Sequence, residues 1–164
     1  MRHVIALVLA LTAGTVQAGV EAYERCIGPD FEERVMATFK QRFPSEKCDS
    51  TATCPENTME TTIMLTRGQC RVAALSQCGS AKCRLGLEER WRADGMALEA
   101  RIEDGLSDID MDALPALQFR RLSNRDLWFT PNDCTGDAGI CAASRAGQTL
   151  GDLERISAEV EALQ

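Results

Sequence analysis

Cysteine is the residue type with the most chemical potential in this chain of 164 residues. Thiols can hold zinc, carry out thiol–disulfide exchange or pair as structural disulfides. The sequence contains no Cys-x-x-Cys, the motif of thiol oxidoreductases, and the cysteine spacings do not repeat a zinc knuckle. Four disulfides are therefore favoured, and a zinc site made of cysteines alone is the alternative. The eight cysteines are Cys26, Cys48, Cys54, Cys70, Cys78, Cys83, Cys134 and Cys141.

Six of the cysteines form three sets that lie close in sequence, in turn-rich segments or at expected helix junctions. Their proximity predicts three local disulfides and leaves two distant cysteines to pair with each other. Eight cysteines allow many other connectivities, so this pairing is a hypothesis. The predicted disulfides are Cys48–Cys54, Cys78–Cys83, Cys134–Cys141 and Cys26–Cys70.

Histidine is almost absent, since the only one is His3. Its place near the N-terminus argues against Ser-His and Cys-His nucleophiles, histidine general bases and histidine metal ligands. We therefore predict a protein that is not an enzyme, with no catalytic residue, no cofactor and no metal ion. A hydrolase that uses carboxylates alone is the remaining enzymatic alternative.

The first eighteen residues have the features of a signal peptide. Arg2 and His3 give a positive start, residues 4–11 are apolar, and Val16-Gln17-Ala18 has the small-x-Ala form of a cleavage site. The apolar run is too short for a bilayer core of about 30 Å, and no cysteine follows the predicted cut. We expect cleavage after Ala18, a periplasmic location and no membrane anchor. Such an oxidising compartment suits disulfides.

Acidic residues outnumber basic ones in the predicted mature chain. Loss of Arg2 leaves 17 Lys and Arg against 25 Asp and Glu, a net charge of −8. This balance disfavours nucleic acid and favours a cationic protein partner, although solubility alone could explain it. We expect the contact residues in an acidic loop over 103–112 and in a second cluster before the last helix. These candidates are Asp104, Asp108, Asp110 and Asp112 in the loop, and Asp133 and Asp137 in the second cluster.

A calcium site is a possible use of the loop, because Asp108, Asp110 and Asp112 are spaced like the start of a calcium loop. The sixth position is Ala113 rather than glycine, and the twelfth is Phe119 rather than glutamate. A solvated loop is therefore favoured over a calcium site.

Residues 19–164 are expected to form a single all-α domain, because no segment alternates apolar and polar residues for long. We predict a small antiparallel helical bundle of four or five helices cross-linked by disulfides, since short links join antiparallel neighbours. The first helix should break at Gly28-Pro29, Asn57 or Thr58 should cap the second, and Ser80 the third. The expected helices cover about 21–43, 57–76, 81–102, 112–129 and a last helix that reaches Leu163.

Asp94 lies among apolar residues in the helix expected at 81–102. Leu87, Trp91, Leu98 and Ile102 project onto one stripe, and Asp94 projects onto the same stripe. A carboxylate there needs a cation, and we predict Arg125 or, failing that, Arg121. The alternative is that the helix frays near Gly95 and Asp94 reaches water. In the helix that follows, we expect one apolar face, made by Leu114, Leu117, Leu122, Trp128 and Phe129.

The sequence from about 70 to 153 resembles the LprI-type lysozyme-inhibitor domain of bacterial exported proteins. The residues that carry the resemblance are Cys83, Ala93-Asp94, Leu98, Gln118, Arg125-Asp126, Cys134, Cys141 and Leu153. Arg121 replaces a tryptophan of the family pattern, and Glu99 replaces an asparagine. Residues 19–69 lie outside the resemblance and form an N-terminal helical extension to the LprI-like region 70–164.

The resemblance implies an exported soluble binding protein that docks on a cationic, lysozyme-type cell-wall hydrolase without catalysis. The negative charge fits the same partner. The alternative function is a disulfide-bonded structural or assembly module of the cell envelope with no inhibitory activity. The sequence does not indicate an oligomeric state.

Overall fold

Helices account for all the regular secondary structure of residues 18–42, 56–123 and 134–164, which the computed structural model describes. These residues contain no strand, so the predicted all-α fold is confirmed. None of the helices in these ranges is long and apolar enough to cross a membrane. The predicted signal peptide, apart from Ala18, lies outside the described residues. After a helical segment at 18–26, the elements are α2 (Phe31–Arg42), α3 (Glu56–Ser76), α4 (Ala81–Leu106), α5 (Leu114–Ser123) and α6 (Ala138–Glu161).

Local signals account for most of the helix boundaries. The first helical segment ends at residue 26 and α2 begins at Phe31, so the break at Gly28-Pro29 is confirmed. The Ser80 side chain accepts the backbone N–H of Cys83 at 3.2 Å and caps α4, as predicted. The predicted cap of α3 was wrong, because α3 already begins at Glu56. The acidic loop is also shorter than expected, since α4 continues to Leu106.

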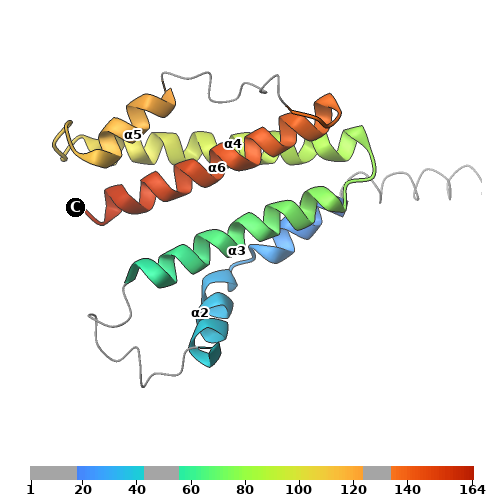
Figure 1. Ribbon diagram of the computed structural model, residues 1–164, viewed down its shortest axis with the longest axis horizontal. Coiled ribbons are helices and arrows are strands. Elements are labelled where there is room, and N and C mark those ends of the chain that lie inside the picture. The colour runs from blue at the N-terminus through green and yellow to red at the C-terminus, as the bar shows by residue number, and fades with distance from the viewer. Residues whose placement is uncertain (1–17, 43–55, 124–133) are drawn as a thin grey trace, which may run out of the picture.

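α4 and α6 lie side by side and run in the same direction (Figure 1). At one end of the pair Arg84 lies beside Gly139, in the middle Trp91 lies beside Gly147, and at the other end Gly105 faces Val160. α3 and α4, which a short link joins, run in opposite directions (Figure 1), but they pack against α6 rather than chiefly against each other. The expectation of antiparallel neighbours does not hold for α4 and α6, which are not consecutive, because α5 and residues 124–137 separate them in the chain.

Two glycines allow the close approach of α4 and α6. A Cβ atom on Gly105 would lie 2.7 Å from Cγ1 of Val160, and one on Gly147 would lie 3.2 Å from the ring of Trp91. A larger residue at Gly105 would therefore force the helices apart. Small residues at such crossings let larger side chains from the partner helix pack directly on the backbone.

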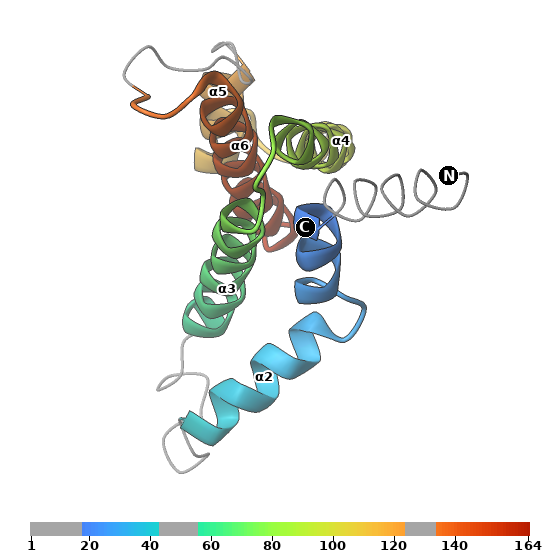
Figure 2. The ribbon, with the colours of Figure 1, turned by 90° about the vertical axis from the view of Figure 1, so that its right-hand side faces the viewer.

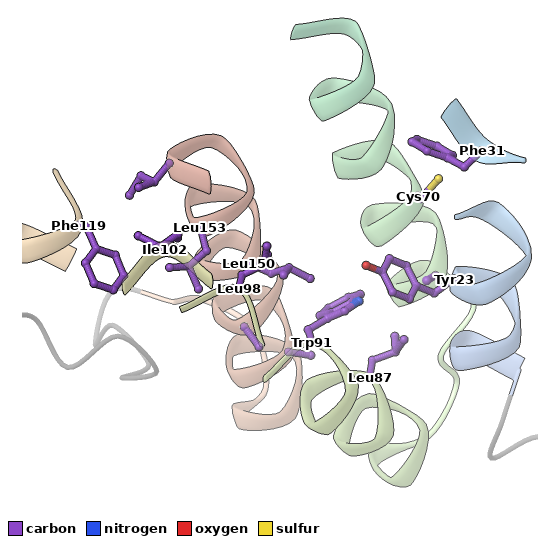
Figure 3. Packing of buried hydrophobic residues seen from close by; sticks show 14 of the residues in the cluster. Tyr23, Phe31, Cys70, Leu87, Trp91, Leu98, Ile102, Phe119, Leu150 and Leu153 are labelled. Carbon is purple, nitrogen blue, oxygen red and sulfur yellow. The ribbon is translucent and has the colours of Figure 1, made fainter. Parts of the chain in front are cut away.

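Trp91 is at the centre of the core, with only 1% of its surface exposed (Figure 3). Its ring meets that of Tyr23 edge to face, with centroids 5.6 Å apart. The predicted apolar stripe of α4 is confirmed, because Leu87, Leu98 and Ile102 are buried with it. α2 packs on α3 and projects away from α4 and α6 (Figure 2).

The prediction for the buried face of α5 was wrong. Leu114 and Leu117 are exposed, whereas Ala116 and Phe119 are buried and Leu122 is only partly buried. The two pairs lie on opposite faces, because they are offset by two residues on a helix of 3.6 residues per turn. Either face is apolar, and the structure buries the one on which the large Phe119 ring is paired with an alanine small enough to permit close packing.

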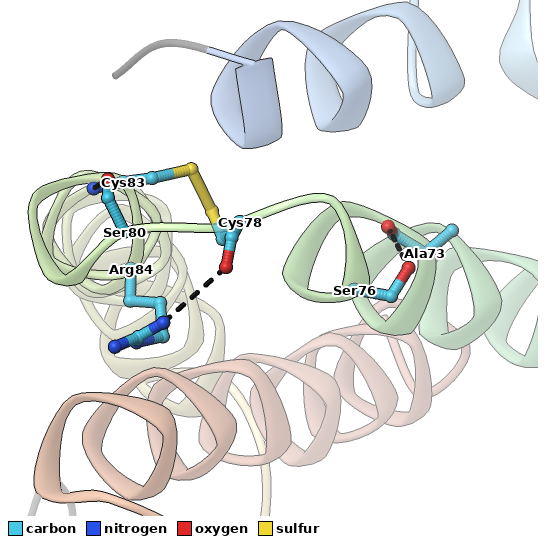
Figure 4. The surroundings of a disulfide bond; sticks show 6 residues. All are labelled: Ala73, Ser76, Cys78, Ser80, Cys83 and Arg84. Carbon is cyan, nitrogen blue, oxygen red and sulfur yellow. Dashed lines mark hydrogen bonds between the residues drawn. A yellow bond between two sulfur atoms is a disulfide. The ribbon is translucent and has the colours of Figure 1, made fainter. Parts of the chain in front are cut away.

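Three of the four predicted disulfides are confirmed. Cys26–Cys70 joins the N-terminal helical segment to α3, and Cys78–Cys83 closes the turn between α3 and α4 (Figure 4). Cys134–Cys141 fixes the start of α6. The fourth pair, Cys48–Cys54, lies outside the described residues, and none of the described cysteines is free.

The disulfides differ in the length of chain that they close, and their removal should differ accordingly. Cys26 and Cys70 are 44 residues apart, whereas Cys78 and Cys83 are 5 apart. By loop-closure entropy, replacing the first pair with alanine should cost about 4 kcal/mol and replacing the second about 2 kcal/mol. Denaturant unfolding of the two double variants measures the difference. Equal losses would contradict a role of Cys26–Cys70 in restricting the unfolded chain.

Candidate functional site

Five carboxylates gather at the end of α4 and in the turn that leads to α5. We call Glu103, Asp104, Asp108, Asp110 and Asp112 the acidic turn; all five are exposed. The Asp110 side chain accepts the backbone N–H of Asp112 at 3.0 Å, but no ion pair joins any of the five to another described side chain. The described residues also contain no group of three or more side chains arranged to hold a metal ion. The acidic turn is therefore a surface of unpaired negative charge.

Apolar side chains continue from this turn onto α5. Met111, Leu114 and Leu117 follow one another at three-residue steps, and 43%, 65% and 46% of their surfaces are exposed. A shallow groove of about 390 Å³ lies next to Met111 and is also lined by Glu103 and Phe119, but not by Leu114 or Leu117. Arg120 also lines it, so the groove combines both signs of charge with apolar surface. The end of the molecule thus offers apolar contact area next to unpaired carboxylates.

The second predicted acidic cluster is not part of this surface. Asp133 lies outside the described residues, and Asp137 caps α6 by accepting the N–H of Ile140 at 2.9 Å. Asp137 also pairs with Arg84 at 3.0 Å, near the start of α4. Arg84 and Asp104 are separated by about 30 Å of helix at 1.5 Å per residue. The two clusters thus lie at opposite ends of α4, and Asp137 is engaged in the fold.

Asp94 is paired, as predicted, but with a different cation. Arg90, one turn earlier on α4, donates from Nε to both carboxylate oxygens at 3.0 and 3.1 Å. Arg90 also pairs with Glu24 at 2.6 Å, and its hydrogen bond to Asp94 raises the pKa of the guanidinium. Arg121 is exposed on α5, and Arg125 lies outside the described residues. The Asp94 side chain is 31% exposed, so this is a half-buried pair within one helix.

The buried ion pair of the molecule joins α3 to α6. Arg71 Nη1 lies 2.9 Å from Oε2 of Glu154, and their side chains are 10% and 8% exposed. Arg67 approaches the same carboxylate at 3.7 Å, pairs with Glu32 of α2 at 2.6 Å and lies over the ring of Phe31. Our sequence reasoning missed this network. Its only local signal is the pair Gly147 and Gly151, against which the Arg71 side chain lies.

These charges surround a cleft of about 680 Å³ next to Tyr23. Burial raises the pKa of the Tyr23 hydroxyl to about 12, against an opposing effect of the nearby Arg71 charge. Asp94 and Glu154 both line the cleft, and each is held by an arginine. The negative charges of these two carboxylates are therefore neutralised by arginines within the fold.

Glu99, which stands where the LprI-type pattern has an asparagine, is a carboxyl group with a raised pKa. Burial raises its pKa, helped by the charge of Glu103, and its Oε1 atom is buried without a hydrogen-bond partner. Glu99 does not line the cleft of Asp94 and Glu154. The carboxyl group with the raised pKa therefore lies apart from the two carboxylates of that cleft, Asp94 and Glu154, each of which is paired with an arginine.

Two other residues of the LprI-type pattern take part in packing or hydrogen bonding between helices. Leu98 is buried in the core, and Gln118 accepts a hydrogen bond from Arg155 of α6 at 2.6 Å, which links α5 to α6. Asp126 lies outside the described residues. Comparison of this chain with family models, curated proteins and solved structures finds no match. The resemblance to the LprI-type domain therefore rests on the sequence pattern alone.

The two ion pairs should contribute very differently to stability. Replacing Asp94 with alanine should cost no more than about 1 kcal/mol, because the Arg90 pair is half exposed. Replacing Glu154 with alanine should cost about 3–5 kcal/mol, because Arg71 would remain buried without a counter-charge. Urea unfolding of the two variants measures both values. Changing Arg71 to Met and Glu154 to Leu together should restore much of the loss, and equal costs for the two single variants would contradict this assignment.

Tyr23 is the only tyrosine in the chain, so its titration can be followed directly by phenolate absorbance. The midpoint should lie near 12 in the folded protein, against 10.0 for an unperturbed tyrosine. Since the unfolded chain releases this proton at lower pH, the stabilising effect is complete below pH 10 and is lost as the pH rises to about 12. The loss should be about 2–3 kcal/mol. Tyr23→Phe should remove this part of the alkaline decline, and a midpoint near 10 would mean that the ring is solvated.

Proposed function

We propose that this chain is an exported, non-catalytic binding protein of the lysozyme-inhibitor type, and that the acidic turn docks on a cationic cell-wall hydrolase. The observation that carries the proposal is the contrast between carboxylates that serve the fold and those of the acidic turn. Glu24, Glu32, Asp94, Asp137 and Glu154 are all paired with arginines. The five of the acidic turn have no such partner among the described residues.

A cluster of unpaired like charges is unfavourable in the free protein, because the charges repel one another. A cationic partner removes that repulsion on binding and is attracted before contact, which raises the association rate. Polypeptides of neutral or negative surface would gain nothing from the same site. The acidic turn therefore favours a basic protein, and lysozymes are typically basic.

The exposed apolar residues next to the turn supply the second component of an interface. Protein interfaces combine a core that excludes water with a polar, charged rim. Met111, Leu114 and Leu117 offer such a core, and the acidic turn offers the rim. In this arrangement the carboxylates govern association rate and specificity, while the apolar residues contribute most of the affinity.

Surface plasmon resonance against several lysozymes tests this proposal. Association should slow several-fold between low and physiological salt, where the screening length falls to about 8 Å. Changing Asp108, Asp110 and Asp112 together to asparagine should cause the same slowing at low salt without lowering the melting temperature. The matched control changes Glu21, Glu33 and Glu89 to glutamine, which removes equal charge from exposed sites elsewhere. This control should bind nearly as fast as the unmodified protein.

Two results would count against the proposal. Equal slowing in both triple variants would show that net charge, rather than the acidic turn, controls association. Failure to bind any lysozyme at micromolar concentration would end the inhibitor proposal and favour a structural or assembly module of the cell envelope.

A further inference from the structure

A groove of about 870 Å³ lies between α3 and α6, away from the acidic turn. Its apolar lining comes mostly from α3 and includes Val72, which is 71% exposed, and Leu65, which is 64% exposed. Gly68 also lines it, and a Cβ atom at Gly68 would meet nothing within 4 Å. The volume lies in the range of about 300–1,000 Å³ that is typical of small-molecule sites, and spaces between helices are a common place for them.

Two buried hydrogen-bond donors belong to residues that line this groove. Nε1 of Trp91 and Nε of Arg145 are both buried without a hydrogen-bond partner. Buried donors are nearly always satisfied in proteins, because an unpaired one costs the free energy of its lost hydration. Both atoms are covered by protein, so a molecule bound in the groove would contact the indole ring and the rest of the Arg145 side chain instead.

The charges around the groove define the chemistry of that molecule. Arg145 forms no ion pair with a described residue, whereas the other arginine of the lining, Arg71, is neutralised by Glu154. Asp152 is exposed and lies seven residues after Arg145 on α6, about 10 Å further along the helix. One end of the groove therefore attracts an anion and the other repels it.

We propose that the α3–α6 groove binds a single-chain amphipathic carboxylate of the fatty-acid class. The carboxylate lies at Arg145, and the acyl chain extends along Val72 and Leu65 over the backbone at Gly68. Asp152 sets the orientation by repelling the head group from the far end. This binding site is separate from the acidic turn, so it does not depend on the lysozyme-inhibitor proposal.

Titration of the folded, oxidised protein with dodecanoate tests the site. Calorimetry should show saturable binding, and the indole N–H resonance of Trp91 should shift with the same saturation. The chain has only two tryptophans, so Trp128→Phe leaves one indole signal and assigns it. Absence of saturable binding below the micelle concentration would overturn the proposal and favour an apolar helix of a partner protein as the occupant.

Variants of the lining separate this groove from non-specific uptake of the ligand. Gly68→Leu should abolish binding, because its side chain enters open space in the groove without a clash, whereas Gly68→Ala should bind much as the unmodified protein does. Arg145→Gln should weaken dodecanoate binding at least about tenfold and leave dodecanol binding nearly unchanged. Arg101→Gln, which removes an exposed arginine of the other cleft, is the matched control. Thermal unfolding checks that each variant folds. Unchanged dodecanoate affinity in both Gly68→Leu and Arg145→Gln would overturn the proposal.

Discussion

The close contact between Trp91 and Gly147 is the constraint on which the rest of the fold depends. A tryptophan ring can lie against the α6 backbone only because position 147 has no side chain, and a Cβ atom there would lie 3.2 Å from the ring. The same ring meets Tyr23 from the N-terminal segment and lines the groove beside α3. Because one buried side chain contacts or borders so many elements, the parallel pair of α4 and α6 and the helices around it form a single core.

A buried pair of charged groups packs against this core. The Arg71 side chain lies against α6 at Gly147 and Gly151 and reaches Glu154, so Gly147, which admits the Trp91 ring, also admits the arginine of the buried ion pair. Removing charges from water is costly unless they are paired and hydrogen-bonded. The pairing of Arg71 with Glu154, supported by Arg67, therefore restricts how α3 can sit on α6. Cys26–Cys70 adds a covalent link from the N-terminal segment to the same helix.

The two surfaces proposed for binding differ in their relation to the core, because the α3–α6 groove borders Trp91 and Arg71 whereas the residues of the acidic turn are exposed. The acidic turn is at the end of α4, beyond the disulfides and arginine pairs that hold the helices together. The α3–α6 groove is open in part because α3 presents Gly68, where a larger side chain would fill the space. The exposed side chains of both surfaces, such as Val72, Leu65 and the carboxylates of the acidic turn, are not buried in the core.

Local interactions allowed the sequence alone to determine much of this protein. Proline geometry predicts the break at Gly28-Pro29, and capping predicts the role of Ser80. Helical periodicity predicts the stripe of Leu87, Trp91 and Leu98. Cysteine spacing predicts three disulfide pairings. Each of these depends on residues close in the chain, apart from Cys26–Cys70, which followed by elimination.

Only the tertiary structure decided how the helices meet. The periodicity of α5 leaves two apolar faces, and packing chose the face with Ala116 and Phe119 over that with Leu114 and Leu117. The sequence placed Asp94 on an apolar stripe, but the position of α4 against its neighbours left the carboxylate half exposed, where Arg90 of the same helix could reach it. The parallel course of α4 and α6 has no local signature, and the pairing of Arg71 with Glu154, 83 residues apart, has only the weak local signal of Gly147 and Gly151. Such contacts depend on the relative placement of whole helices, which helical periodicity does not specify.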